Sequence, residues 1–170
     1  MASAPYTNVN LRAGQEAVER ALYAVGDLWD DMNFIGIDVE METTEAILDE
    51  ALAYVPRLGR RPAIYSARWA WLEYMNNSER YKAFPLINAF YDSDPDVDFW
   101  RYPYGGWKSV VGEQYQNTTT VHGVEVDFDW FDDQWIKEGQ MTVIVVLVTI
   151  SAGETIGVSF IERKGEYAFP

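Results

Sequence analysis

The sequence contains no cysteine and a single histidine, His122. Without cysteine the chain can form neither disulfides nor thiolate metal sites, and it has no thiol nucleophile. Zinc sites usually draw on several His or Cys side chains, so a zinc hydrolase is disfavoured. A histidine-based triad would have to centre on His122, and Ser66 lies in no G-x-S-x-G context. We therefore expect no metal and no cofactor, and a loop position for His122 before Gly123.

Basic residues are scarce as well. The 170 residues include 13 Lys and Arg against 27 Asp and Glu, which gives a formal net charge of −14. Nucleic-acid binding requires clustered Lys and Arg to neutralise phosphates, and anionic lipid attracts the same side chains. We therefore expect neither a nucleic-acid nor a membrane partner.

Long apolar runs are missing. The most apolar run, residues 141–150, is about half as long as the ~20 residues of a membrane-spanning helix. Its many β-branched residues predict a buried strand instead. Residues 1–12 show no basic start followed by an apolar stretch, so we expect no signal peptide in this sequence.

What remains is an ordinary globular composition, with 48% hydrophobic and 24% charged residues. Aromatic residues make up 15% of the chain. Trp and Tyr combine a flat apolar face with a polar tip, which suits the walls of sugar-binding clefts as well as protein cores.

Predicted helices and strands alternate over the first hundred residues. Helical spacing of apolar residues predicts the helices, the second of which has Thr43 or Thr44 as its N-cap and Gly59 as its stop. This alternation indicates βα units and a parallel sheet. The predicted helices are 13–31, 44–58 and 67–74, and the predicted strands are 34–39, 63–66, 85–91, 109–115 and 124–129.

The pattern changes after Gly139. Two apolar segments, residues 142–150 and 156–161, are separated by Gly153. Their composition predicts an antiparallel pair of strands at the end of the chain.

The strongest local feature is the run Ile37-Asp38-Val39-Glu40. Residues two apart on a strand point to the same side, so Asp38 and Glu40 should project together from the carboxyl end of a parallel strand. Active sites of α/β sheets and barrels lie at that end. Repulsion between the two carboxylates should raise the pKa of one of them, and glycoside hydrolysis uses a protonated acid beside an ionised one. A pair of solvated acids is the simpler alternative.

A second carboxylate pair, Asp127 and Asp129, shares one face of the strand predicted at 124–129. The alternative is that Asp129 caps a following helix through residues 130–136. Polar and aromatic residues also stand at other predicted strand ends: Tyr65, Tyr91, Gln114 and Tyr115.

Four aspartates alternate in the segment 92–98, and Ca²⁺ favours clustered carboxylates. The EF-hand pattern fails here, because the turn glycine would fall at Val97 and the closing glutamate at Pro103. A solvated acidic loop is the simpler interpretation.

The order of these elements resembles the second part of a glycoside hydrolase family 25 lysozyme, the muramidase family of phage endolysins and bacterial autolysins. The resemblance covers about two thirds of the chain. Residues 37–40 resemble the family's D-x-E strand, 61–66 its kP-x-iY-s/t strand, 85–91 its pLW-x-A-x-Y strand, 113–115 its WQY motif, and 123–129 its G-x-x-vD-x-n strand.

This resemblance implies a role for each matching residue. Glu40 matches the general acid and Asp38 the carboxylate that assists it. Asp127 matches a carboxylate that stabilises the transition state or orients the substrate's N-acetyl group. The cleft-lining positions are Tyr65, Tyr91, Gln114 and Tyr115. The implied substrate is peptidoglycan, cleaved at the β-1,4 bond between N-acetylmuramic acid and N-acetylglucosamine at the bacterial cell wall, with no metal.

The sequence also departs from the family pattern. Residues 1–12 supply no first strand with the family's D-x-S aspartate, and the next two βα units are missing. Ile87 and Glu113 stand where the motifs have Trp. The fold class that follows is α/β, a partial TIM-like (β/α) barrel without its first βα units (residues 13–138) and a C-terminal β-hairpin-like extension (139–170). An open sheet edge makes self-association plausible, and a non-catalytic glycan-binding or structural relative is the alternative function.

Overall fold

The computed structural model describes residues 13–26, 32–95, 97–121, 124–132, 134–136, 142–149 and 158–164. Its helical elements are α1 (Ala13–Val25), α2 (Glu45–Tyr54), η2 (Val55–Leu58), α3 (Arg68–Tyr74) and η3 (Phe99–Arg101). Its strands are β1 (Met32–Asp38), β2 (Arg61–Ala67), β3 (Leu86–Ala89), β4 (Gly112–Val121), β5 (Val124–Phe131), β6 (Thr142–Thr149) and β7 (Val158–Lys164).

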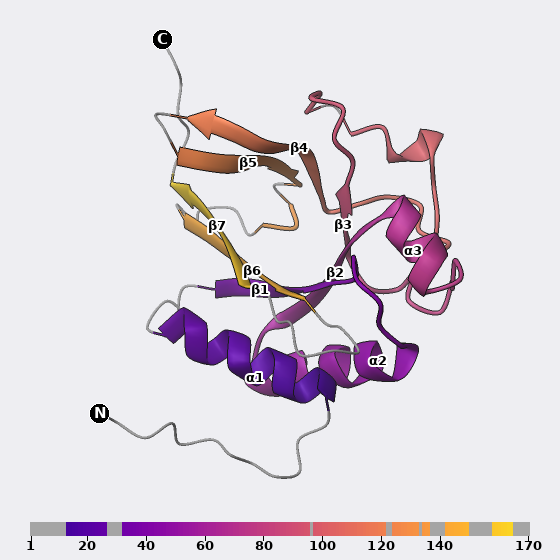
Figure 1. The fold of residues 1–170 in the computed structure, drawn as a ribbon, viewed down its shortest axis with the longest axis vertical. Coiled ribbons are helices and arrows are strands. Elements are labelled where there is room, and N and C mark those ends of the chain that lie inside the picture. The colour runs from indigo at the N-terminus through magenta and orange to yellow at the C-terminus, as the bar shows by residue number, and fades with distance from the viewer. Residues whose placement is uncertain are drawn as a thin grey trace.

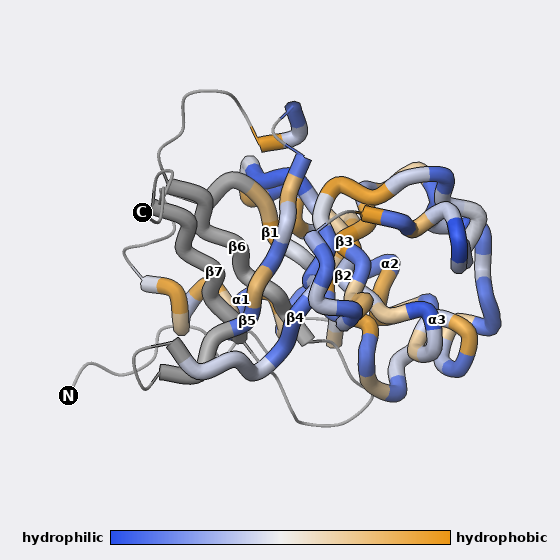
Figure 2. The backbone as a smooth tube through the Cα atoms, turned by 90° about the horizontal axis from the view of Figure 1, so that it is seen from above, coloured by the Kyte–Doolittle hydropathy of each residue, from blue (hydrophilic) through white to orange (hydrophobic). Residues whose placement is uncertain are grey.

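All seven strands form one curled sheet in the order β5-β4-β3-β2-β1-β6-β7 (Figure 1). The five central strands are parallel, and β5 and β7 pair antiparallel to β4 and β6 at the two edges. Helices α2 and α3 lie to the right in both views, on the side of the molecule where β2 and β3 also lie (Figures 1 and 2). This arrangement confirms the predicted α/β fold class, a partial barrel-like sheet.

The C-terminal strands complete the sheet on the far side of β1. Strand β6 pairs parallel to β1 from Met32 to Asp38, and β7 pairs antiparallel to β6. The predicted antiparallel pair is therefore confirmed. It adds to the sheet at the edge where β1 would otherwise stand unpaired. The domain boundary predicted after residue 138 stays a prediction. Strands β6 and β7 belong to the same sheet as β1 to β5.

Local sequence signals explain the ends of α2. The side chain of Thr44 accepts a hydrogen bond from the Ile47 amide at 3.3 Å, as an N-cap does. The predicted helix 44–58 changes to a 3-10 turn after Tyr54, because Pro56 has no N–H to donate to the preceding turn. Gly59 then ends the segment with φ 73°, in the left-handed conformation that glycine adopts most easily.

Helix α1 packs closely against α2. It begins at Ala13 as predicted, and the predicted residues 27–31 lie outside the described part. A Cβ on Gly14 would stand 2.2 Å from the backbone oxygen of Ile47, so only glycine fits this contact. The Gly14 amide also donates to Glu50 Oε2 at 3.2 Å, which ties the start of α1 to α2.

The alternative that Asp129 caps a helix is wrong. Strand β5 continues to Phe131, because Trp130 and Phe131 pair with Glu113 and Gly112 of β4. A turn follows where that alternative placed a helix, and Asp132 stabilises the turn by accepting a hydrogen bond from the Gln134 amide at 2.8 Å. His122 and Gly123 lie outside the described residues.

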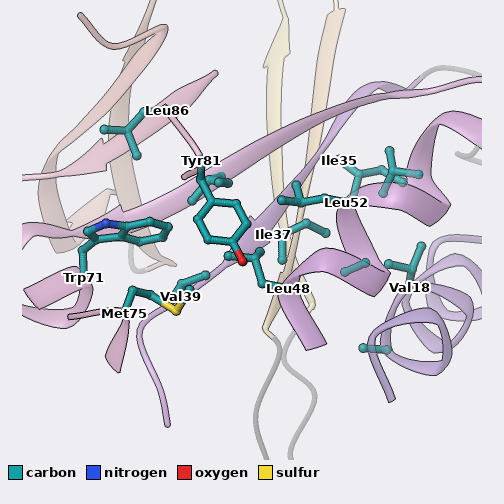
Figure 3. Close-up of a cluster of buried hydrophobic side chains, with 14 of the residues drawn as sticks. Val18, Ile35, Ile37, Val39, Leu48, Leu52, Trp71, Met75, Tyr81 and Leu86 are labelled. Carbon is teal, nitrogen blue, oxygen red and sulfur yellow. The ribbon is translucent and has the colours of Figure 1, made fainter. Parts of the chain in front are cut away.

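The alternation of strand residues creates two apolar clusters. On the outer face, Ile35, Ile37 and Val39 pack against the helices, as Figure 3 shows with Leu48 and Trp71. On the inner face, a smaller cluster fills the curl of the sheet: Phe34, Ala63, Tyr65, Ala67, Ala70, Ile87, Ala89, Phe131 and Ile136. Across the described residues, every helix is too short or too polar to cross a bilayer.

Candidate active site

The carboxyl end of β1 places Asp38 on the inner face of the sheet. Asp38 is the last residue of the strand and stands opposite Tyr65 of β2 on one side and Thr149 of β6 on the other. It has the same parity along β1 as the inner-face residue Phe34. The structure thus puts the first predicted carboxylate at the edge of the sheet where parallel strands end.

Glu40 follows two residues after Asp38 and is half-buried. Burial raises the pKa of the Glu40 carboxyl to about 7, and the nearby charge of Asp38 raises it as well. A carboxyl with this pKa is substantially protonated near neutral pH. Glu40 can therefore donate a proton where an ordinary glutamate has already lost it.

A hydrogen-bonded chain connects the next strand ends. The Tyr65 hydroxyl donates to Gln114 Oε1 at 2.5 Å, and the Tyr91 hydroxyl lies 2.9 Å from the same oxygen. Gln114 Nε2 donates to Asp127 Oδ2 at 2.9 Å. Four predicted site residues from β2, β4, β5 and the loop after β3 therefore form one network.

The backbone of β4 also holds Asp127. The amide of Thr118 donates to Asp127 Oδ1 at 2.7 Å. Thr118 has φ 46°, a conformation that is rare for a β-branched residue, and the β4–β5 register shifts between Gln116 and Thr119. This irregularity of β4 turns an amide toward the carboxylate, so both oxygens of Asp127 accept hydrogen bonds.

Electrostatic coupling joins the two groups of carboxylates. Burial raises the pKa of the Tyr91 hydroxyl, the hydrogen bond with Tyr65 lowers it, and the negative charges of Glu40, Asp127 and Asp38 raise it; the net shift is upward. Tyr65 lies under the same influence, because burial and then Glu40 raise its pKa well above the usual range. The structure therefore brings together Asp38, Glu40, Tyr65, Tyr91, Gln114 and Asp127.

Tyr115 does not join this network. Its ring stacks on Phe128 of β5, with 6.2 Å between the centroids and 20° between the planes. Neighbouring residues on a strand point to opposite sides, so Gln114 and Tyr115 cannot both face the carboxylates.

Asp129 is a carboxylate that sequence reasoning placed beside Asp127 without assigning it a role. It stands opposite Gln114 in the sheet, and its Oδ1 is buried without a hydrogen-bond partner among the described residues. Burial raises the pKa of Asp129 to about 7, and the charge of Asp127 raises it too. The D-x-D spacing is the sequence signal for this second protonated carboxyl near the network.

A second polar network lies on the outer face of the same strands and was not foreseen. Glu113 Oε2 accepts a hydrogen bond from Asn88 Nδ2 at 2.7 Å. The Tyr104 hydroxyl lies 3.0 Å from Asn88 Oδ1 and 2.8 Å from the Ser66 carbonyl oxygen. Polar residues inside otherwise apolar strand segments are the only sequence signal for this network.

The acidic segment offers no metal site in the described part of the chain. No three His, Asp, Glu or Cys side chains there lie close enough together to hold a metal ion. Asp92 Oδ1 instead accepts the Asp94 amide at 3.0 Å, which stabilises the loop, and Asp96 lies outside the described residues. The calcium alternative therefore gains no support from Asp92, Asp94 and Asp98.

Comparison with known proteins places these features in a family context. No family model matches the sequence. Over 115 residues it is 32% identical to probable GH family 25 lysozyme 3 of Dictyostelium discoideum, covering 62% of this chain and 22% of that protein. It is also 32% identical over 110 residues to counting factor 50 of the same organism, covering 59% of this chain and 36% of that protein.

The fold has a counterpart among solved structures. The spore cortex lytic enzyme SleM of Clostridium perfringens matches 91% of this chain and 55% of its own, with 18% sequence identity and a TM-score of 0.54. This chain thus spans roughly a fifth to a third of the first curated relatives and about half of that structure. In sequence, over about 60% of its length, the chain resembles the glycoside hydrolase family 25 lysozymes.

Proposed function

We propose that this chain carries the catalytic carboxyls of a muramidase-type glycosidase, which hydrolyses the β-1,4 bond between N-acetylmuramic acid and N-acetylglucosamine in peptidoglycan. The observation that carries the proposal is the pair Asp38 and Glu40 at the carboxyl end of β1. Burial and the charge of Asp38 raise the pKa of Glu40 to about 7. A proton donor beside an ionisable carboxylate is the arrangement that glycoside hydrolysis requires.

Each residue of the network has a role in this proposal. Glu40 protonates the glycosidic oxygen of the leaving sugar, and Asp38 keeps that proton on Glu40 near neutral pH. Asp127, held by Gln114 and the Thr118 amide, presents a fixed negative charge to the developing positive charge or to the substrate's N-acetyl group. Tyr65 and Tyr91 line the cleft and fix the orientation of Gln114.

Replacing Glu40 tests this assignment. We expect Glu40→Gln to lower the rate at which the protein clears a peptidoglycan suspension by at least 100-fold, because the amide cannot donate the proton. Glu42→Gln is the matched control, since Glu42 is an exposed glutamate two residues away. Both variants should unfold at the same urea concentration as the wild type. Equal clearing by Glu40→Gln and wild type would remove Glu40 from the mechanism.

A non-catalytic glycan-binding relative is the second candidate function. One structural observation favours it: β6 pairs with the edge of β1 beside Asp38. One relative is moreover named a counting factor, not a lysozyme. This function predicts saturable binding to cell-wall glycan without new reducing ends, whereas hydrolysis releases them.

Self-association belongs to the same set of proposals. Strands β5 and β7 pair on one side only within the described sheet, so each presents an edge. Edge pairing between copies should give a mass in light scattering that rises with protein concentration. A constant monomer mass at protein concentrations up to about 100 μM, on the order of the dissociation constant of a weak complex, would contradict it.

A further inference from the structure

The backbone between Asp38 and Glu40 is held by two hydrogen bonds from β2. Just past the end of β1, the Val39 amide donates to the Tyr65 carbonyl oxygen at 2.9 Å. The Val39 carbonyl oxygen accepts a hydrogen bond from the Ser66 hydroxyl at 2.7 Å. Both polar backbone groups of the residue between the two carboxyls are therefore fixed by neighbouring residues of β2.

The bond from Ser66 determines the direction in which the chain leaves the sheet toward Glu40. A peptide unit is planar, so the Val39 carbonyl and the Glu40 amide can only turn together. Val39 and Ser66 are both 0% exposed, so water cannot replace their hydrogen bond. Ser66 Oγ also lies 3.2 Å from the Ala67 carbonyl oxygen, but a hydroxyl has one proton and its shorter contact is with Val39. The Ser66 hydroxyl therefore opposes a rotation that would move Glu40.

Ser66 is itself fixed by the buried polar network on the outer face of the sheet. The Tyr104 hydroxyl lies 2.8 Å from the Ser66 carbonyl oxygen and 3.0 Å from Asn88 Oδ1. Asn88 Nδ2 donates to Glu113 Oε2 at 2.7 Å. These four side chains are at most 5% exposed and come from β2, β3, β4 and the segment before β4. The network therefore crosses three adjacent strands and ends at the Val39 carbonyl.

Stability alone does not account for this buried polar network. Buried polar groups lose their hydration, and hydrogen bonds only compensate for that loss. Glu113 Oε1 is buried without a hydrogen-bond partner among the described residues. Val39 lies among apolar side chains on the same outer face (Figure 3). Burial and then the charge of Glu40 raise the pKa of Tyr104, so the network lies within electrostatic reach of Glu40.

We propose that Ser66 is a positioning residue for Glu40, acting through its hydroxyl on the Val39 carbonyl and held in place by Tyr104. The inference rests on the proposed function, in which Glu40 is the proton donor. Ser66 has the same parity along β2 as Ile64, which packs in the outer-face cluster, whereas Asp38 lies on the inner face. Ser66 therefore acts through the backbone and not on the glycan.

The experiment compares Ser66→Ala and Tyr104→Phe with the wild type. Each change removes one hydroxyl and adds no atom, so each new side chain fits the space of the old one. We expect Ser66→Ala to lower kcat for peptidoglycan hydrolysis about tenfold and to leave KM within about twofold, because a misplaced acid slows proton transfer without removing a glycan contact. Tyr104→Phe should act in the same direction with a smaller effect.

The matched control is Tyr54→Phe. The Tyr54 hydroxyl donates to Glu19 of α1 from the last residue of α2, whereas Glu40 precedes the first turn of that helix. Tyr54→Phe therefore also removes one tyrosine hydroxyl and its hydrogen bond, but at the other end of α2. It should change neither kcat nor the titration of Glu40.

A second measurement does not depend on hydrolysis. The titration of the Glu40 carboxyl is followed by NMR of labelled glutamate side chains, and the Glu40→Gln protein identifies its signal. Burial is the larger cause of the wild-type pKa of about 7. A Glu40 side chain released toward water should therefore titrate at lower pH in Ser66→Ala, closer to the ordinary value of 4.5.

The outcomes separate this inference from the proposed function. If the wild type clears no peptidoglycan but Ser66→Ala lowers the pKa of Glu40, Ser66 positions Glu40 and the hydrolytic function falls. An unchanged Glu40 titration in Ser66→Ala overturns the inference, whatever the clearing assay shows. Equal shifts in Ser66→Ala and Tyr54→Phe also overturn it, because any loss of stability would then suffice. Urea unfolding shows whether each variant folds, and Tyr104→Phe carries the same test if Ser66→Ala does not.

Discussion

Gln114 Nε2 donates a hydrogen bond to Asp127 Oδ2 at 2.9 Å, and this contact joins the carboxylate of β5 to the tyrosines of its neighbours. The carbonyl oxygen of the same amide accepts from Tyr65 at 2.5 Å. Because a primary amide carries both an acceptor oxygen and a donor nitrogen, Gln114 can bridge a hydroxyl donor and a carboxylate acceptor.

Gln114→Leu should therefore destabilise the protein while keeping the volume of the side chain. Tyr65 is 4% exposed, so its hydroxyl would lose its main acceptor without gaining water. We expect the free energy of unfolding in urea to fall by roughly 1–3 kcal/mol. Tyr91→Phe is the control, since Tyr91 is 47% exposed and the loss should stay below about 1 kcal/mol. An unchanged unfolding midpoint for Gln114→Leu would contradict the network.

Asp38→Asn should shift the pH profile of glycan hydrolysis to lower pH. Glu40 acts in its protonated form, so activity should decline as the pH rises through its pKa of about 7. Removing the charge of Asp38 lowers that pKa, and the shift should be partial because burial is the larger cause. The measurement is kcat/KM between roughly pH 4 and pH 9, a range that brackets the pKa of Glu40 in the wild type and in the variant. A profile identical to that of Glu42→Gln would show that Asp38 does not tune Glu40.

Asp129→Asn should make the protein more stable at alkaline pH. The folded-state pKa of Asp129 is raised from 3.8 to about 7, so the folded chain holds a proton there that the unfolded chain releases. The contribution of Asp129 to the free energy of unfolding should therefore be largest below pH 3.8 and be lost as the pH rises through about 7. The variant should lack this decline, with a gain of roughly 1–3 kcal/mol at pH 8. Urea unfolding at pH 5 and pH 8 measures the difference, and an equal change at both pH values would contradict it.

Gly14→Ala should destabilise the protein although alanine favours helices. The added Cβ would stand 2.2 Å from the Ile47 carbonyl oxygen and 2.8 Å from the Ala51 amide, both backbone atoms of α2. The two helices must separate, at a cost of roughly 1–3 kcal/mol. Ala24→Gly, at an exposed position of the same helix, should cost about 1 kcal/mol by propensity alone. A more stable Gly14→Ala protein would mean that α1 does not pack on α2 as described.

Deletion of residues 139–170 should prevent cooperative unfolding. The deletion removes β6, which pairs with β1 from Met32 to Asp38, and leaves β1 paired with β2 only, so its other backbone edge loses its partner. We expect aggregation in size-exclusion chromatography and loss of a sharp thermal transition. A chain ending at residue 156 keeps β6 and loses only the edge strand β7, so it should retain a transition at lower temperature. Equal behaviour of the two deletions would contradict the role of β6.

Elements with strong local signals could be predicted closely. The apolar run before Asp38 predicts β1, and Thr44 and Gly59 define the ends of the α2–η2 segment through an N-cap and a left-handed residue. The alternative of a helix after Asp129 was wrong, because pairing of Trp130 and Phe131 with β4 outweighs the capping preference of aspartate. Cross-strand pairing is a tertiary effect that a local pattern does not contain.

By itself, the sequence determined the α/β alternation, the D-x-E at the end of a strand, and the set of side chains available for acid–base chemistry. Only the tertiary structure decided which of them meet. It joined Tyr65, Gln114 and Asp127, turned Tyr115 away onto Phe128, and paired β6 with β1. It also raised the pKa values of Glu40 and Asp129 to about 7. The reason is physical: pairing, burial and charge proximity depend on distances between residues far apart in the chain, which only the folded structure sets.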